Sequence, residues 1–144
     1  MTAIYLDGGE EMRKALASMS DEIRANVSRA VIGTALEIQG EAKERVQRGS
    51  KTGRVYKLSN PTRTHQASAP GQAPATDLGR LVNSITFDQR GQLSAVVDAN
   101  ALYAAYLEYG TRHIAPRPFF RPAAEAKRQT FGERVAKAVA RGMK

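Results

Sequence analysis

The stretch YAAYLEYGTRHIAPRPFFRPA, residues 103–123, changes character three times within one short segment. Residues 103–109 have the apolar spacing of a short helix. Gly110-Thr111 ends it, because glycine adopts the left-handed conformation that terminates helices at no steric cost. Residues 114–118 are expected to run extended, since each proline fixes its own φ and disfavours the α region for the residue before it. Phe119-Phe120 follows. A segment this apolar and stiff must lie against its own core or against a neighbouring subunit.

A long helix is predicted upstream, from Ser20 to about Arg48. Ser20 has the character of an N-cap, and the two acids after it lie where the helix dipole favours negative charge. Gly33 and Gly40 inside the helix each cost about 1 kcal/mol relative to alanine. We expect them to permit close packing by another backbone. The apolar residues recur at three- and four-residue spacing and form one stripe: Ile23, Val27, Val31, Ala35, Ile38, Ala42 and Val46.

The remaining pattern alternates short helices and strands. Tyr5 and Leu6 suit a short strand, and residues 10–19 suit a helix. Thr76 or Asp77 is predicted to cap a short helix whose inner face holds Leu78, Leu81, Val82 and Ile85. Residues 84–88 and 93–99 read as a β-hairpin with Ile85 and Phe87 inward. Asn100 is predicted to cap the helix of residues 103–109, and another helix runs from Pro122 to about Arg141. The predicted fold is α+β: a small antiparallel sheet packed by a long N-terminal helix, short helices and a C-terminal helix.

The length suits a single domain, 1–144, with a long basic loop at about 49–76. Gly, Ser, Thr, Pro and basic residues dominate this loop, and a loop of this length inside a small domain is usually functional or mobile. Residues 54–58 have the pattern of a strand, and Asn60-Pro61 and Pro70-Gly71 are turn signals. The alternative is a flexible surface hairpin.

The net charge of +8 is distributed in blocks. Residues 1–42 and 64–111 are acidic, with net charges of −3 and −2, whereas residues 43–63 and 112–144 carry +6 and +7. The basic blocks suggest contact with nucleic acid. The alternatives are solvated faces, or oppositely charged faces that dock between subunits. A basic nucleic-acid-binding module therefore stays open as an alternative function.

The sequence offers no signature of catalysis. There is no cysteine, which excludes disulfides and thiolate metal sites. His65 and His113 have no partner at metal-ligand spacing, and phosphate-binding and hydrolase motifs are lacking. No apolar run approaches the roughly 20 residues of a membrane span, and the N-terminus lacks a signal-peptide pattern. We expect a protein made inside the cell that is not an enzyme and has no cofactor, metal or membrane partner.

Glu108 is the acid that stands out, because it lies just before the glycine that ends its helix. We expect it to form an ion pair with Arg112, Arg117 or Arg121 and thereby to fix the reversal of chain direction. The alternative is a solvated helix residue.

Two stretches together resemble a known family. ASAPGQAPATDLGRLVNSI, residues 67–85, is similar to the pattern S-x-P-G-x-x-P-x-x-x-x-G-x-L-x-x-S-I, and YAAYLEYGTRHIAPRPFFRP, residues 103–122, to Y-A-x-Y-L-E-x-G-T followed by R-P-F-x-R-P. Both occur in this order in the neck and tail-completion family of long-tailed bacteriophages, typified by the tenth gene product of a lambdoid phage. The chain departs from the pattern at Asp77-Leu78, where threonine often precedes Gly79.

The resemblance implies a structural virion protein at the head–tail junction, assembled in the host cytoplasm. It would form a homo-oligomeric ring, with sixfold symmetry matching the tail tube, that completes or terminates the tail and joins it to the head connector or stopper protein. The expected subunit interface comprises Glu108, Gly110, Thr111, Arg112, Arg117, Pro118, Phe119, Phe120, Arg121 and Pro122. Within the 49–76 loop, Lys51, Arg54, Lys57 and Arg63 would reach the adjacent ring or the lumen through which DNA passes. Tyr103, Tyr106 and Leu107 are assigned to the subunit's own core, and Arg117 to Pro122 to the contact beyond it.

Overall fold

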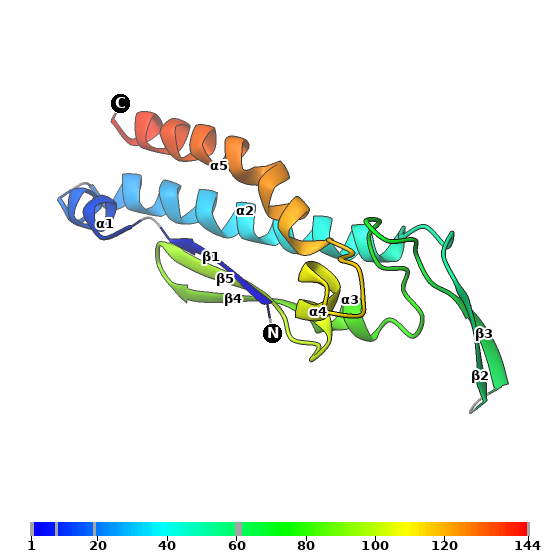
Figure 1. The fold of residues 1–144 in the computed structure, drawn as a ribbon. Coiled ribbons are helices and arrows are strands. Elements are labelled where there is room, and N and C mark those ends of the chain that lie inside the picture. Colours follow the sequence, from blue (N-terminus) through cyan, green and yellow to red (C-terminus); the bar gives the residue numbers. More distant parts are fainter. Residues whose placement is uncertain (1, 8, 19, 60–61, 144) are drawn as a thin grey trace.

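The computed structural model describes residues 2–7, 9–18, 20–59 and 62–143. The elements follow the order β1 (Thr2–Asp7), α1 (Gly9–Ala17), α2 (Asp21–Gln47), β2 (Val55–Ser59), β3 (Thr62–Gln66), α3 (Arg80–Ser84), β4 (Ile85–Gly91), β5 (Ser94–Ala99), α4 (Ala104–Tyr109) and α5 (Phe120–Gly142). The fold is α+β, as the sequence predicts. Helix α2 forms the spine of the molecule, with the larger sheet on one side and α5 on the other (Figure 1).

The larger sheet has the order β1-β5-β4, and both pairings are antiparallel. The predicted hairpin of β4 and β5 is confirmed, with Ile85 fully buried and Phe87 packed against the core. Strand β1 adds to the far side of β5, so the N-terminal and central parts of the chain share one sheet. The predicted apolar stripe of α2 covers this sheet, and Val27, Ala35, Ala42 and Val46 are all at most 1% exposed.

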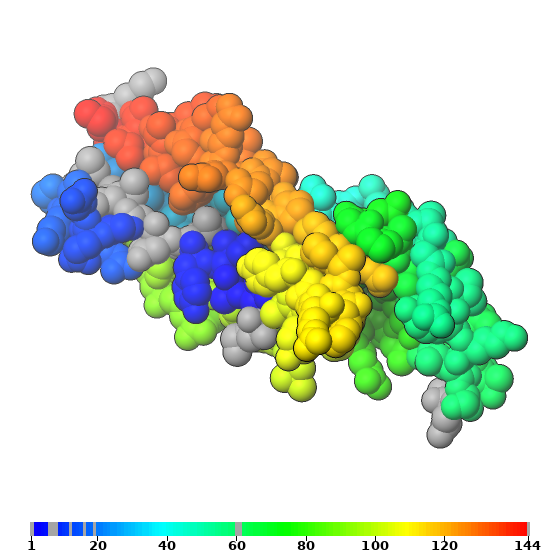
Figure 2. Space-filling view, in the orientation of Figure 1, coloured from blue at the N-terminus to red at the C-terminus, as the bar shows by residue number. Residues whose placement is uncertain are grey.

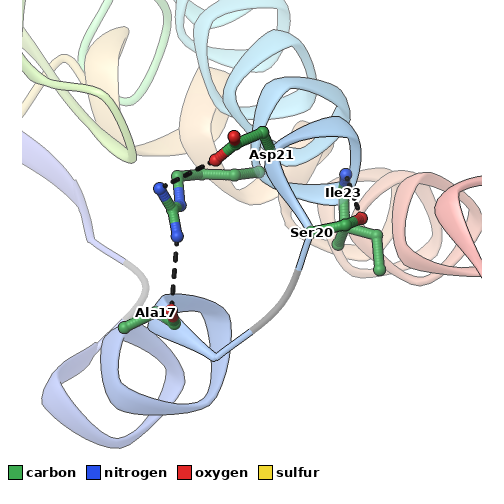
Figure 3. A network of polar contacts seen from close by, with 5 residues as sticks. Ala17, Ser20, Asp21 and Ile23 are labelled. Atoms are coloured by element: carbon green, nitrogen blue, oxygen red, sulfur yellow. Dashed lines mark hydrogen bonds and ion pairs between the residues drawn. The ribbon is translucent and has the colours of Figure 1, made fainter.

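Helix α2 begins where the sequence predicts. Ser20 is its N-cap, and the Ser20 hydroxyl accepts a hydrogen bond from the Ile23 N–H at 3.5 Å. Arg24 joins the start of α2 to the end of α1, because its guanidinium reaches Asp21 and the carbonyl of Ala17, each at 3.3 Å (Figure 3). This contact holds the N-terminal α1 against the first turn of α2.

Helix α5 runs back along α2, and the oppositely charged segments of the chain meet there. Glu37 of α2 pairs with Arg134 at 2.7 Å and with Lys127 at 3.8 Å. Some of the opposite charges that could have paired between neighbouring subunits therefore pair within one chain. These pairs are partly exposed, so each contributes at most about 1 kcal/mol to stability.

Strands β2 and β3 form a separate two-stranded sheet that projects from one end of the molecule (Figure 1). The predicted long loop is thus largely a hairpin, although its Asn60-Pro61 turn lies outside the described residues. The base of this hairpin is closed by two backbone hydrogen bonds, since Gly53 N–H donates to the Ala67 carbonyl at 2.8 Å and Ala67 N–H to the Arg54 carbonyl at 3.0 Å. A Cβ at Gly53 would collide with the Ser68 backbone, so only glycine fits there.

Two predicted helix caps are wrong. Helix α3 begins after Gly79, which has a φ of 72° and supplies no side chain, whereas Asp77 contacts Arg63 of the hairpin. Helix α4 has Tyr103 as its N-cap, and the Asn100 side chain donates to Thr86 Oγ1 at 2.9 Å instead. In both cases the side chain that was predicted to cap the helix bonds to a residue of a distant segment instead.

Two expectations about packing are also wrong. No described atom lies within 4 Å of a Cβ built at Gly33 or Gly40, so no other backbone of this chain packs closely there. Leu78 is 57% exposed and precedes α3, so it does not share the buried face of Leu81 and Val82.

Candidate functional site

Glu108 organises the segment that the sequence singles out. It lies on the inner side of α4 and is only 4% exposed. Its carboxylate accepts three backbone hydrogen bonds, from the N–H groups of Phe119 and Phe120 at 2.9 Å each and from that of Arg121 at 2.8 Å. These groups form the N-terminus of α5, where a helix leaves its N–H groups without intrahelical partners and where its dipole favours negative charge.

The predicted ion pair of Glu108 with an arginine is therefore replaced by a helix cap supplied from a different helix. Phe119, the N-cap residue of α5, provides no side-chain cap of its own. Glu108 takes over that role from eleven residues upstream. The carboxylate fixes the chain reversal, as expected, but its partners are backbone donors.

The connection between α4 and α5 is a tightly bonded loop. Gly110 ends α4 with a φ of 76°, and a Cβ there would lie 2.8 Å from the Ile114 carbonyl oxygen. The Thr111 hydroxyl accepts from the N–H groups of His113 and Ile114 at 3.2 and 3.1 Å. Arg117 N–H then donates to the Leu107 carbonyl at 2.6 Å, which returns the chain to α4. The expected Gly110-Thr111 stop is confirmed.

Phe119 and Phe120 belong to the core of the subunit. Both side chains are 0% exposed, and their ring centroids lie 6.0 Å apart with planes tilted by 50°. The assignment of these two side chains to a contact beyond the subunit is therefore wrong. They anchor the first turn of α5 against α2 and the sheet, and they are the two largest fully buried side chains of the described chain.

The tyrosines show the reverse arrangement. Tyr103 and Tyr106 were expected in the core but are 42% and 58% exposed, and Tyr109 is 64% exposed. Leu102 and Ile114 are also exposed, at 89% and 46%. Tyr106 and Tyr109 are three residues apart and are neighbours on the surface of α4, while Leu102 and Tyr103 precede the helix and Ile114 follows it. We call the set of Leu102, Tyr103, Tyr106, Tyr109 and Ile114 the tyrosine face.

The other predicted interface residues divide by exposure. Gly110, Arg117, Pro118 and Pro122 are half-buried, whereas Thr111, Arg112 and Arg121 are exposed. In the hairpin, Lys51, Arg54 and Lys57 are exposed, and the Arg54 guanidinium lies 5.4 Å from the centroid of the Tyr56 ring. Arg63 is turned toward the body and pairs with Asp77. In Figure 2 the hairpin residues occupy one end of the molecule.

Polar groups also meet where β3 faces the segment before α3. Asp77 bonds to Arg63 and lies 3.6 Å from His65 Nδ1. The hydrogen bond from Arg63, together with the positive charge of the same guanidinium, lowers the pKa of Asp77 against the opposing effect of desolvation. Sequence reasoning missed this cluster, because its members are twelve and fourteen residues apart and no local spacing connects them.

The described part of the chain contains no group of three metal-ligating side chains. Among the described helices, none is long and apolar enough to cross a bilayer. The surface features described above are an aromatic face, a projecting basic hairpin and a polar cluster at its base.

Comparison with known families identifies the class of protein. A family model described as "Bacteriophage HK97-gp10, putative tail-component" matches residues 10–110, well over half of the chain. The chain belongs to this HK97-gp10-like family and is a structural component of a bacteriophage tail. No curated protein and no solved structure matches it. The matched range contains the whole of the 67–85 motif and the 103–110 half of the second motif, and it ends before the loop and α5.

Proposed function

We propose that the chain forms a homo-oligomeric ring at the head–tail junction, completing the tail and joining it to the head connector. The observation that carries this proposal is the tyrosine face. Five large apolar side chains from one short helix and its flanks are exposed together, although the subunit has a well-packed core of its own. Clustered exposed aromatic residues mark protein–protein contacts, and tyrosine is enriched at such contacts.

The rigidity of this surface supports its use in assembly. Glu108, Gly110 and Thr111 fix the orientation of α4 and of the loop that follows, so few degrees of freedom remain to be lost when a partner binds. Arg112 and Arg121 are exposed in the loop after α4 and in the first turn of α5, where they are available for charged contacts with a partner. In a head-to-tail ring, this surface meets a different surface of the next copy.

The projecting hairpin suits contact with the neighbouring layer of the neck or tail. Lys51, Arg54 and Lys57 lie on a two-stranded arm at one end of the molecule, away from the α2–α5 core (Figure 1). We propose that this arm reaches the adjacent ring or lines the DNA passage. Contact with DNA there needs only phosphate neutralisation and no base readout.

The test of the ring is Tyr106→Ala combined with Tyr109→Ala, with Tyr5→Ala as the matched control. Tyr5 is 74% exposed but lies on β1, outside the tyrosine face. We expect the double variant to retain the wild-type circular dichroism spectrum and unfolding temperature, while mass photometry shows loss of the oligomer. Tyr5→Ala should assemble normally. A double variant that assembles as well as the wild type would contradict this contact, and absence of the protein from purified tails would contradict the proposed location.

A second candidate, non-specific nucleic-acid binding, is favoured by one observation. Arg29 of α2 and Arg134, Lys137 and Arg141 of α5 line a surface hollow of about 500 Å³. Binding through such a cluster should weaken steeply with salt concentration, because counterions are released when phosphates are neutralised. Lys137→Gln with Arg141→Gln should abolish retention of a duplex oligonucleotide at low salt. If the wild type does not retain the duplex, this candidate is rejected.

A further inference from the structure

A pocket of about 350 Å³ lies at the base of the hairpin and reaches the edge of the tyrosine face at Tyr103. Its wall is assembled from five segments: β3, the stretch between the hairpin and α3, the start of α3, the first part of α4 with its N-cap residue, and the loop before α5. The 67–85 motif supplies a large part of this wall. The ring contact proposed above is tested at Tyr106 and Tyr109, and neither of them lines the pocket.

The polar side of the pocket has an excess of positive charge. Arg63, Arg80 and Arg117 line it with Asp77 as their only acidic neighbour in the wall, so the pocket carries a net charge of +2 while His65 is neutral. Asp77 neutralises Arg63 through their direct contact. The positive charges of Arg80 and Arg117 are then left without a carboxylate among the residues that line the pocket.

Several polar atoms in the same wall lack partners. Among the described residues, no hydrogen-bond partner exists for the hydroxyls of Ser68 and Thr76 or for the Nε atoms of Arg63 and Arg117. Ser68 is 0% exposed, and a buried polar group without a partner costs about 1–3 kcal/mol. Such groups are rare in folded proteins unless a ligand or water satisfies them. These atoms have almost no exposed area, so they add to the polarity of the wall without contacting a ligand directly.

The pocket also has an apolar side that remains open to solvent. Leu78 and Tyr103 line it while 57% and 42% exposed, and Leu81 and Leu107 lie beside them. The ligand that fits both sides carries an oxygen acceptor with negative charge and an apolar group next to it.

From these contacts we propose that the pocket binds an acidic segment of a partner protein. A glutamate or aspartate carboxylate would pair with Arg80 and Arg117, and a neighbouring apolar side chain would cover Leu78 and Tyr103. Planar guanidinium groups match carboxylates in two-point geometry. A phosphate fits less well, because its second negative charge would lie near the ionised Asp77 and its surroundings would include the apolar side chains. The proposal does not depend on the ring, since a monomer presents the complete pocket.

The first experiment is selection from a randomised heptapeptide library on the immobilised full-length protein. Selected peptides should be enriched in Asp or Glu adjacent to an apolar residue. The same selection on Arg80→Gln, and on Arg80→Gln combined with Arg117→Gln, should lose this enrichment. Arg128→Gln is the matched control, because Arg128 is an 82% exposed arginine of α5 outside the pocket. Arg80→Gln alone decides the outcome if Arg117→Gln disturbs folding, since Arg80 is an exposed residue at the start of α3. Selection without acidic enrichment, or with enrichment unchanged in Arg80→Gln, overturns the proposal.

The second experiment is an NMR titration with the best selected peptide and with its Glu→Gln or Asp→Asn counterpart. We expect backbone shift changes to concentrate in residues 63–81, 103–107 and 117, and the neutral peptide to bind about tenfold more weakly or worse. Inorganic phosphate and a poly-dT oligonucleotide serve as the competing anions. If either competitor displaces the acidic peptide at equal concentration, or if the shift changes map to another surface, the pocket is not a carboxylate site for a protein partner.

Discussion

Replacement of Glu108 by alanine tests whether one carboxylate holds the end of α4 to the start of α5. The substitution removes three hydrogen bonds of 2.8–2.9 Å and leaves the N–H groups of Phe119 and Phe120 buried without an acceptor. A hydrogen bond to a charged group contributes about 1.5–3 kcal/mol, but three that share one acceptor are not additive. An exposed helix cap is worth about 0.5–2 kcal/mol. We therefore expect Glu108→Ala to lower the free energy of unfolding by about 3 kcal/mol.

Glu108→Gln separates the charge from the hydrogen bonds. Glutamine has the same shape and keeps one acceptor oxygen, so it should retain part of the cap while losing the interaction with the helix dipole. The expected loss is about 1–2 kcal/mol. Urea unfolding followed by circular dichroism measures both variants, and hydrogen exchange should accelerate first at the amides of residues 119–121.

Two controls distinguish this cap from the ion pair that the sequence suggests. Glu125→Ala removes a carboxylate of α5 that is 55% exposed and lies 3.9 Å from Arg128, and it should change stability by less than about 1 kcal/mol. Arg121→Gln should be equally mild, because the Arg121 side chain is not needed for the bond that its backbone makes. If Glu108→Ala costs less than about 1 kcal/mol, or if Arg121→Gln costs as much as Glu108→Ala, the capping interpretation is refuted.

Three further predictions concern the core, the glycines and the hairpin base. Phe120→Ala should destabilise the subunit by about 3–5 kcal/mol in urea unfolding, because the side chain is fully buried; a variant that folds normally but fails to assemble would restore the interface assignment. Gly40→Ala should raise the free energy of unfolding by about 1 kcal/mol and the unfolding temperature slightly, since no described atom lies within 4 Å of the added methyl group. Gly110→Ala should lower the unfolding temperature, because alanine is strained at the positive φ of this residue. Destabilisation by Gly40→Ala, or stabilisation by Gly110→Ala, would contradict the description of that glycine. The lowered pKa of Asp77 means that its contribution to stability is present above the ordinary value of 3.8 and is lost as pH falls through the lowered value. NMR titration of the Asp77 carboxyl should give a midpoint below 3.8 that rises in Arg63→Gln, and an unchanged midpoint in that variant would exclude Arg63 as the cause.

The elements that sequence reasoning placed well are those specified by local spacing. The stripe from Ile23 to Val46 repeats with the period of a helix over 24 residues, and Ser20 can cap it without help from any distant segment. The β4–β5 hairpin is equally local, because alternation and a polar turn occur within one short stretch. In these regions each residue's preference agrees with the final fold, so reading the sequence was sufficient.

The division between core and surface in the 103–122 stretch could not be predicted in this way. Tyrosine and phenylalanine are both large and apolar, and a helix of six residues is too short for its spacing to identify the buried side. The buried acid in fact selects that side. Glu108 must reach the N–H groups of α5, and Tyr106 and Tyr109 are consequently turned outward. The missed roles of Asp77 and Asn100 have the same cause, since their partners come from other segments.

Helix α4 has a buried acid, Glu108, and two exposed tyrosines, Tyr106 and Tyr109. One short helix can therefore stabilise the subunit on one side and, in the proposed ring, contact a partner on the other. The cap of Glu108 and the burial of Phe119 and Phe120 lie on the inner side of the α4–α5 connection, so the fold does not need the tyrosines for its core. The outer side is then available for contact, while its backbone geometry is fixed from within. A partner that binds this face meets side chains whose supporting helix is already ordered, which lowers the entropic cost of association. The same reasoning explains why a stiff loop rich in proline follows the helix: residues 114–118 keep their conformation without being buried, and they return the chain to the point where Glu108 can cap α5.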